Sequence, residues 1–224
     1  MMEIEDLEKQ FIVHADKFDE RESLINFICF RENFAKNFVS TIKDSTENSK
    51  TKKILVLDLD ETLVHSSFYQ LDYYDYCIPI EIEGNSFDLY VQKRPYVDKF
   101  LDSVMNDFTV FIFTASVPQY ANPIIDLLCP ELPPYRRLFR EQCTFVEGLY
   151  IKDLSIFHAP LENIVIVDNN PCSFLNDPSN AILSVTWEGD QEDDELVSRI
   201  LPLLQECKNA SDVRNILPQK MLIP

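Results

Sequence analysis

Glycine is scarce in this 224-residue sequence, which contains only Gly84, Gly148 and Gly189. Glycines this far apart cannot form GxxxxGKS/T or GxGxxG, the loops that hold nucleotide phosphates in P-loop and Rossmann folds. The sequence therefore excludes both kinds of nucleotide site. Any site in this chain that handles phosphate must use another arrangement of the backbone.

Long apolar runs and clustered metal-binding residues are also missing. No stretch approaches the roughly 18 consecutive apolar residues of a transmembrane helix. The N-terminus, MMEIEDLEKQ, is too acidic for a secretory signal or a transit peptide. Three histidines and six cysteines are scattered without a CxxC pair, so we expect neither a zinc cluster nor a disulfide framework. Free thiols in a reducing compartment are the simpler interpretation.

Positive charge is in the minority. The chain has 20 Lys and Arg residues against 38 Asp and Glu residues, which gives a formal net charge of −18. Proteins that bind nucleic acid through electrostatics present a basic face. We therefore expect no direct binding to nucleic acid and, from the missing apolar run, no association with a membrane.

The polar stretch DSTENSKTKK, residues 44–53, separates two parts of the chain. It has no apolar residue and is typical of a solvated linker. Before it, apolar residues between positions 23 and 42 recur at roughly helical spacing, which predicts one or two amphipathic helices. These helices either pack onto the main domain or bind a partner. We predict a helical extension and linker over residues 1–50, a main domain over 51–217 and a tail over 218–224.

After the linker, apolar strands alternate with amphipathic helices. The predicted strands are 54–57, 108–113, 164–167 and 181–185, and the predicted helices are 95–105, 119–128 and 194–206. Segments 77–82 and 87–91 flank Glu83-Gly84-Asn85, which predicts a β-hairpin inserted soon after the first strand. This alternation predicts an α/β fold with a mainly parallel sheet flanked by helices.

Polar side chains follow three of the predicted strands. The first strand ends in Asp58-Leu59-Asp60, the second in Thr114-Ala115-Ser116 and the third in Asp168-Asn169. The carboxyl ends of parallel strands meet at one edge of the sheet, where ligands bind. A single aspartate at a strand end is usually a turn or helix cap. The whole set, with Lys152 as a candidate cation, indicates instead a functional site at that edge.

The stretch DLDETLVHSS, residues 58–67, matches the pattern DxDxT/V, and the chain resembles the phosphotransferases of the haloacid dehalogenase superfamily. The closer likeness is to the small phosphatases that act on the RNA polymerase II C-terminal domain. Further similar segments are KRPYVDKFL (93–101), FTASVPQYANP (113–123), RRLFREQC (136–143), GLYIKDLS (148–155), IVIVDNNP (164–171) and SNAILSVTWEGDQEDDEL (179–196). The likeness runs from about residue 52 to about residue 217. Asn170 departs from it, because the family usually has serine there.

This resemblance implies a haloacid-dehalogenase-like, Rossmannoid fold and a Mg²⁺-dependent protein serine/threonine phosphatase with an aspartyl-phosphate intermediate. Asp58 would be the nucleophile, and Asp60 would protonate the leaving alkoxide and then activate water. Mg²⁺ would be held by the Asp58 carboxylate, the Asp60 carbonyl and the Asn169 side chain. Lys152, oriented by Asp168, would offset charge on the phosphoryl oxygens. The implied catalytic set is Asp58, Asp60, Thr114, Lys152 and Asp168.

The resemblance also implies a substrate. Residues matching Phe68, Tyr120 and Arg140 line the approach to the site in those phosphatases, where an aromatic pocket can accept a proline of an extended Ser-Pro peptide. The alternatives are core packing for Phe68 and Tyr120 and a surface ion pair for Arg140. The implied partner is the phosphorylated RNA polymerase II tail, and we expect a monomeric enzyme in the nucleus or the cytoplasm.

Other functions on the same fold stay open. The enzyme could act on another phosphoprotein. A non-catalytic binding module is a further alternative, but the intact aspartates count against it. A membrane-tethered phosphatase, a mitochondrial import component and a large phosphatase with a BRCT domain are disfavoured, because the sequence shows no transmembrane segment, no transit peptide and no BRCT domain.

Overall fold

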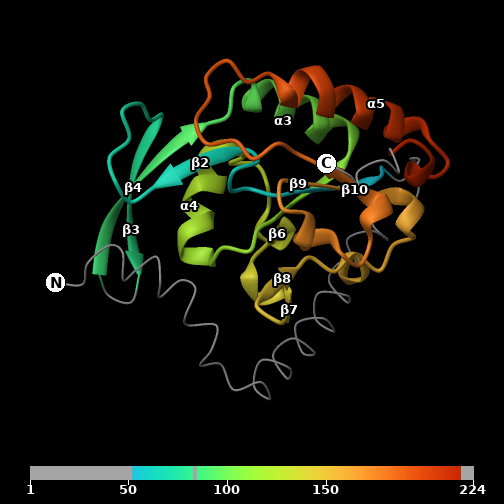
Figure 1. Cartoon of the computed structure of the whole chain (residues 1–224), viewed down its shortest axis with the longest axis horizontal. Coiled ribbons are helices and arrows are strands. Elements are labelled where there is room, and N and C mark those ends of the chain that lie inside the picture. The colour runs from blue at the N-terminus through green and yellow to red at the C-terminus, as the bar shows by residue number, and fades with distance from the viewer. Residues whose placement is uncertain (1–51, 83–84, 218–224) are drawn as a thin grey trace. The chain divides into compact units, whose positions relative to one another are not determined.

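The computed structural model describes residues 52–82 and 85–217 (Figure 1). The helical extension predicted over residues 1–50 and the tail predicted over 218–224 lie outside the described residues. Within the described part of the chain, no helix is both long enough and apolar enough to cross a membrane.

Five parallel strands form the central sheet, in the order β10-β9-β1-β5-β6. Their bounds are β1 (Ile54–Leu57), β5 (Thr109–Phe113), β6 (Arg137–Leu138), β9 (Ile164–Asp168) and β10 (Ala181–Leu183). Strand β1 is in the middle, so its four residues are all buried. The four predicted strands are confirmed. Strand β6 escapes the sequence pattern because two residues are too few to show a periodicity.

The two faces of this sheet are covered differently. Alternate side chains such as Leu55, Leu57 and Val110 pack against α3 (Val97–Asp107), α4 (Pro118–Leu128) and α5 (Leu201–Asn209). Figure 1 shows α3 and α5 side by side, as their contacts require. On the other face Phe111 meets Phe157 edge-on, with ring centroids 4.9 Å apart, and Phe157 belongs to a short 3₁₀ turn. The predicted parallel α/β sheet with flanking helices is confirmed.

The inserted hairpin is part of a small antiparallel sheet with the order β2-β4-β3. Strands β3 (Tyr76–Ile82) and β4 (Asn85–Lys93) form the predicted hairpin, and β2 (Val64–Ser67) pairs with the far half of β4. A second hairpin joins β7 (Thr144–Val146) to β8 (Leu149–Ile151). Its turn residues Glu147 and Gly148 both have positive φ, at 50° and 87°, which suits a tight two-residue turn.

Two predicted helices differ from the structure at their starts. Helix α3 begins after Tyr96, whose φ of 64° cannot continue into an α-helix, instead of at residue 95. The helix predicted over 194–206 is a π-helical turn, Leu196–Ile200, followed by α5. Pro202 stands at this junction and has no N–H to give to an earlier carbonyl, so the regular α-helical ladder is interrupted there.

Candidate active site

The ends of β1, β5 and β9 bring the predicted catalytic residues to one edge of the sheet. Asp58 continues β1, and its N–H donates to the Val167 carbonyl at 2.9 Å. Thr114 continues β5 and Asp168 is the last residue of β9. All three side chains are buried, because the register of the parallel strands aligns them under the following loops. The carboxyl edge of the sheet therefore carries a polar cluster inside the protein.

Lys152 enters this cluster directly after β8. Its ammonium group donates to Asp58 Oδ1 at 2.5 Å and to Asp168 Oδ2 at 2.6 Å. Its backbone N–H donates to the Ser173 carbonyl at 2.7 Å, which holds the chain in place. Burial alone would lower the pKa of Lys152, but the charges of Asp168 and Asp58 outweigh burial and raise it. Lys152 is therefore a permanent cation between two buried carboxylates.

The surroundings of Asp58 disfavour its ionised form. Burial, followed by the negative charge of Asp168, raises the pKa of Asp58 to about 7, although Lys152 acts in the opposite direction. Its second oxygen, Oδ2, accepts a hydrogen bond from the Thr62 hydroxyl at 2.9 Å. A further cation beside Asp58 would favour its ionised form.

Asp60 has a different environment, made of hydroxyl groups. Thr114 and Ser116 each donate to Asp60 Oδ2 at 2.9 Å, and the Tyr120 hydroxyl donates to Oδ1 at 2.5 Å. Burial and the Asp60 charge hold the pKa of Tyr120 well above its ordinary value, so this phenol stays protonated. Thr114, a member of the predicted catalytic set, thus contacts Asp60 directly. Ser116 belongs to the strand end Thr114-Ala115-Ser116 noted in the sequence, but the predicted catalytic set did not include it.

The predicted metal ligands lie around one hydroxyl group. Thr62 Oγ1 is 2.9 Å from Asp58 Oδ2 and 3.4 Å from Asn169 Oδ1. The amide nitrogen of Asn169 donates to Thr186 Oγ1 at 3.2 Å, which leaves the amide oxygen on the Asp58 side. Among the described residues, no group of three or more His, Cys, Asp and Glu side chains could hold a metal. A cation here would instead use one carboxylate, one amide and a backbone carbonyl, a hard oxygen set that suits Mg²⁺ with phosphate and water.

The three predicted substrate-binding residues lie in separate settings. Tyr120 packs against the core, yet its hydroxyl reaches Asp60. Arg140 donates from Nε to the Ala115 carbonyl at 2.6 Å, and its guanidinium lies 4.9 Å from the Tyr150 ring centroid. Phe68 follows β2 and meets the Phe87 ring edge-on at 6.0 Å. The structure thus places Tyr120 at the active site, Arg140 beside the loop after β5, and Phe68 against the inserted hairpin.

The comparison with protein families is decisive for the class of this chain. The model of the family "NLI interacting factor-like phosphatase" matches residues 53–214. The chain belongs to this family. That range covers nearly all the described residues and includes every residue of the catalytic cluster, so the resemblance seen in the sequence motifs is confirmed.

Several relatives support the assignment. A probable C-terminal domain small phosphatase of Dictyostelium discoideum is 46% identical over 75% of this chain and 54% of the relative. The human carboxy-terminal domain RNA polymerase II polypeptide A small phosphatase 2 is 43% identical over 80% of this chain and 65% of the relative. Phosphatase PSR1 of Saccharomyces cerevisiae is 43% identical over 82% of this chain and 43% of the relative. The chain thus spans between 43% and 65% of the length of these relatives.

A solved structure supports the fold. The fission yeast RNA polymerase II CTD phosphatase Fcp1, bound to beryllium fluoride, aligns with a TM-score of 0.52 at 18% identity. The alignment covers 61% of this chain and 42% of that chain. Together with the parallel sheet, this likeness confirms the predicted haloacid-dehalogenase-like fold.

Proposed function

We propose that this protein is a Mg²⁺-dependent protein serine/threonine phosphatase that forms an aspartyl-phosphate on Asp58. The observation that carries the proposal is the contrast between its two motif aspartates. Asp58 is buried against the Lys152 ammonium group, whereas Asp60 is surrounded by three hydroxyl donors. Two carboxylates in such different environments can take two different roles in one reaction.

Asp58 is the nucleophile in this scheme. Unaided hydrolysis of a phosphate monoester is so slow that enzymes accelerate it by up to ~10²¹-fold. A carboxylate divides the reaction into two steps, since its oxygen forms a bond to phosphorus while the alkoxide leaves. Lys152 and Thr62 hold the carboxylate in a defined orientation. The fixed positive charge of Lys152 also offsets negative charge on the transferring phosphoryl group.

Asp60 is the general acid and then the general base. As the acid, it gives its own carboxyl proton to the leaving alkoxide, and it regains a proton from the water that cleaves the aspartyl-phosphate. The hydroxyls of Thr114, Ser116 and Tyr120 orient the Asp60 side chain and add no charge of their own, because they are a phenol and two alcohols.

Mg²⁺ fits the oxygen set formed by Asp58, Asn169 and the carbonyl of Asp60. When bound, the cation screens the negative charge of substrate and nucleophile from each other. Asn169 contributes a neutral amide instead of a third carboxylate, which keeps the site from repelling an incoming phosphate. Thr186 orients that amide through its hydroxyl.

The substrate that we propose is phosphoserine followed by proline, as in the tail of RNA polymerase II. The similarity to the human RNA polymerase II polypeptide A small phosphatase 2 supports the choice of this tail. Another phosphoprotein substrate is the alternative. We also propose a monomeric enzyme of the nucleus or cytoplasm that binds no nucleic acid directly. The aromatic side chains of Phe68 and Phe87, at the inserted hairpin, form the wall that a proline ring would contact.

Hydrolysis of p-nitrophenyl phosphate tests the chemistry. We expect Mg²⁺-dependent turnover by the wild-type protein, its loss in Asp58→Asn, and a reduction of about 10²- to 10⁴-fold in Asp60→Asn. The matched control is Asp102→Asn, which changes an exposed aspartate of α3. Near wild-type turnover by a folded Asp58→Asn protein would reject the mechanism.

Phosphopeptides test the substrate. We expect higher kcat/KM for peptides with phosphoserine before proline than for unrelated phosphoserine or phosphotyrosine peptides. One bound proline ring is worth about 1–3 kcal/mol, or roughly 10- to 200-fold in selectivity. Phe68→Ala should reduce that selectivity without reducing p-nitrophenyl phosphate turnover. Equal rates for all peptides would reject the proline contact and leave a phosphatase of another specificity.

A further inference from the structure

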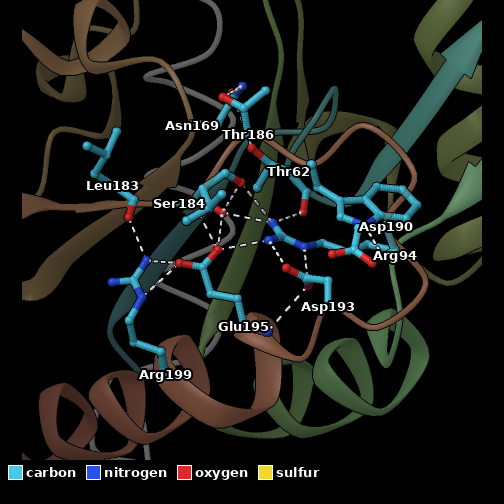
Figure 2. Close-up of polar contacts among 12 residues, drawn as sticks. Thr62, Arg94, Asn169, Leu183, Ser184, Thr186, Asp190, Asp193, Glu195 and Arg199 are labelled. Atoms are coloured by element: carbon cyan, nitrogen blue, oxygen red, sulfur yellow. Dashed lines mark hydrogen bonds and ion pairs between the residues drawn. The ribbon is translucent and has the colours of Figure 1, made fainter.

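Arg94 is the most deeply buried arginine among the described residues, with 1% of its surface exposed. It stands in the segment KRPYVDKFL, to which the proposed chemistry assigns no role. Figure 2 shows its guanidinium at the centre of a polar network, pointing toward Asp193 and Glu195. All three of its nitrogen atoms donate hydrogen bonds. A buried charge this well satisfied indicates a defined position.

The acidic side of the network comes from the loop before α5. Asp193 accepts from Arg94 Nε and Nη2 at 2.8 and 2.9 Å, and Glu195 Oε2 accepts from Nη2 at 2.8 Å. The other oxygen of Glu195 accepts from Arg199, which also donates to the Leu183 carbonyl at 2.7 Å. The network thus ties this loop to the end of β10 (Figure 2).

One branch of the network reaches the nucleophile. Arg94 Nη1 donates to the Thr62 carbonyl at 3.1 Å, and the backbone N–H of Arg94 donates to the Leu63 carbonyl at 3.0 Å. The hydroxyl of Thr62 in turn donates to Asp58 Oδ2 at 2.9 Å. Arg94 therefore holds, from its side chain and its main chain, the segment that orients the Asp58 carboxylate.

A second branch reaches the segment that orients Asn169. Arg94 Nη1 donates to Ser184 Oγ at 2.9 Å, and Glu195 Oε2 accepts the N–H of Val185 at 2.9 Å. The next residue, Thr186, accepts from the Asn169 amide nitrogen at 3.2 Å. Figure 2 shows both branches starting from the same guanidinium. The two side chains that would hold a cation are thus each one hydrogen bond away from a segment that Arg94 holds.

We propose that Arg94, together with Asp193 and Glu195, is a positioning residue that sets the separation of Asp58 and Asn169 and hence the affinity for Mg²⁺. The inference rests on the proposed function, because it assumes that these two side chains share the cation. Mg²⁺ requires near-ideal octahedral geometry, so small displacements of its ligands weaken binding. An arginine suits this role because its planar fork reaches both segments at once, whereas a lysine ammonium cannot.

A purely structural role is the competing explanation, and Arg137 provides a matched control for it. Arg137 is also buried, with 9% of its surface exposed, and pairs with Asp126 at 2.7 Å. Its remaining donors contact the Leu132 carbonyl and Asn122, on and after α4, so they bind none of the catalytic side chains. Replacing either arginine removes a buried guanidinium group. Of the two, only Arg94 has hydrogen bonds that lead toward Asp58 and Asn169.

The test compares the 224-residue wild-type protein with Arg94→Lys, Asp193→Asn and Arg137→Lys. The primary measurement is the Mg²⁺ dissociation constant, obtained from the rise in melting temperature with MgCl₂ concentration in the absence of substrate. We expect Arg94→Lys to weaken Mg²⁺ binding by about 10-fold, the lower end of the effect of removing a direct partner of a metal ligand, because Arg94 acts through Thr62 and Thr186. Asp193→Asn should weaken it less. Arg137→Lys should lower the melting temperature and leave the dissociation constant unchanged.

Unchanged Mg²⁺ binding by folded Arg94→Lys and Asp193→Asn proteins would overturn the inference while leaving the proposed function intact. If Arg94→Lys fails to fold, Asp193→Asn decides alone, since its partly exposed side chain tolerates an isosteric change. If Arg137→Lys weakened Mg²⁺ binding equally, the inference would also be overturned, because a general loss of rigidity in the protein would then explain the effect. A wild-type protein without any Mg²⁺-dependent stabilisation would reject the metal site itself, and this inference with it.

Discussion

Replacing Asp58, the proposed nucleophile, should make the protein more stable at alkaline pH. Asp58 is buried beside Asp168, and burial together with that charge raises its pKa from 3.8 to about 7. The folded state therefore holds this proton more tightly than the unfolded state does. For such a group, stability falls as pH rises through the window between the two pKa values. Asp58→Asn keeps a neutral side chain of the same shape at every pH and escapes this loss.

The size of the effect follows from the same pKa values. At pH 5 the unfolded chain has already lost the Asp58 proton, whereas the folded protein keeps it until the pH approaches about 7. Two further pH units at ~1.4 kcal/mol each give about 3 kcal/mol. We therefore expect the free energy of unfolding of Asp58→Asn, relative to wild type, to increase by about 3 kcal/mol between pH 5 and pH 8.

Urea unfolding measures this difference directly. The chain has a single tryptophan, and Trp187 is buried, so its fluorescence reports unfolding. Both proteins should be measured with EDTA at pH 5, 6, 7 and 8, because a bound cation would favour the ionised form of Asp58. Taking the difference between variant and wild type cancels the titration of the groups that do not interact with Asp58. Asp102→Asn, in which an exposed aspartate is changed, is the control and should show no such trend.

The reasoning would be refuted by a stability difference that does not change with pH, or that favours wild type as pH rises. Either result would mean that Asp58 is ionised at no cost in the folded protein, so that Lys152 fully offsets burial. The expected result would show that the residue assigned to attack phosphorus is held in the fold at the expense of stability.

Three other perturbations give sharp outcomes. Lys152→Met leaves Asp58 and Asp168 buried without their cation and should lower the free energy of unfolding by about 3–5 kcal/mol at pH 8. This loss of stability should become smaller toward pH 5. A loss that does not change with pH in urea titrations would contradict the prediction. Tyr120→Phe removes a hydroxyl donor to Asp60 and should lower kcat by about 10- to 150-fold, from ~1.5–3 kcal/mol for a hydrogen bond to a charged group, whereas Tyr135→Phe, at an exposed ring, should leave kcat unchanged. Cys172→Ser should retain p-nitrophenyl phosphate turnover, because the thiol has no part in the scheme; abolished turnover in a folded protein would mean that the nucleophile is misassigned.

The central sheet could be predicted from the sequence because its signals are local. The strand Ile54–Leu57 is a continuous apolar run, as is typical of a parallel strand that is buried on both faces. The positions of Asp58, Thr114 and Asp168 at its edge then follow from strand direction alone. The short strands β2, β6, β7 and β8 were missed, because a run of two to four residues is defined by the strand it pairs with and not by its own pattern.

Only the tertiary structure decides which polar groups meet. The chain is rich in acidic residues, and nothing local distinguishes Asp193 and Glu195 from the other carboxylates of the run EGDQEDDEL. They pair with Arg94 across 99 and 101 positions of sequence because the segment that carries them lies against the end of β10, where Arg199 of the following π-helical turn contacts the Leu183 carbonyl. The sequence by itself determined the sheet, the family motifs and the candidate nucleophile. The fold determined how Asp58 and Asn169 are held, since hydrogen bonds depend on distances of about 3 Å that only packing can set.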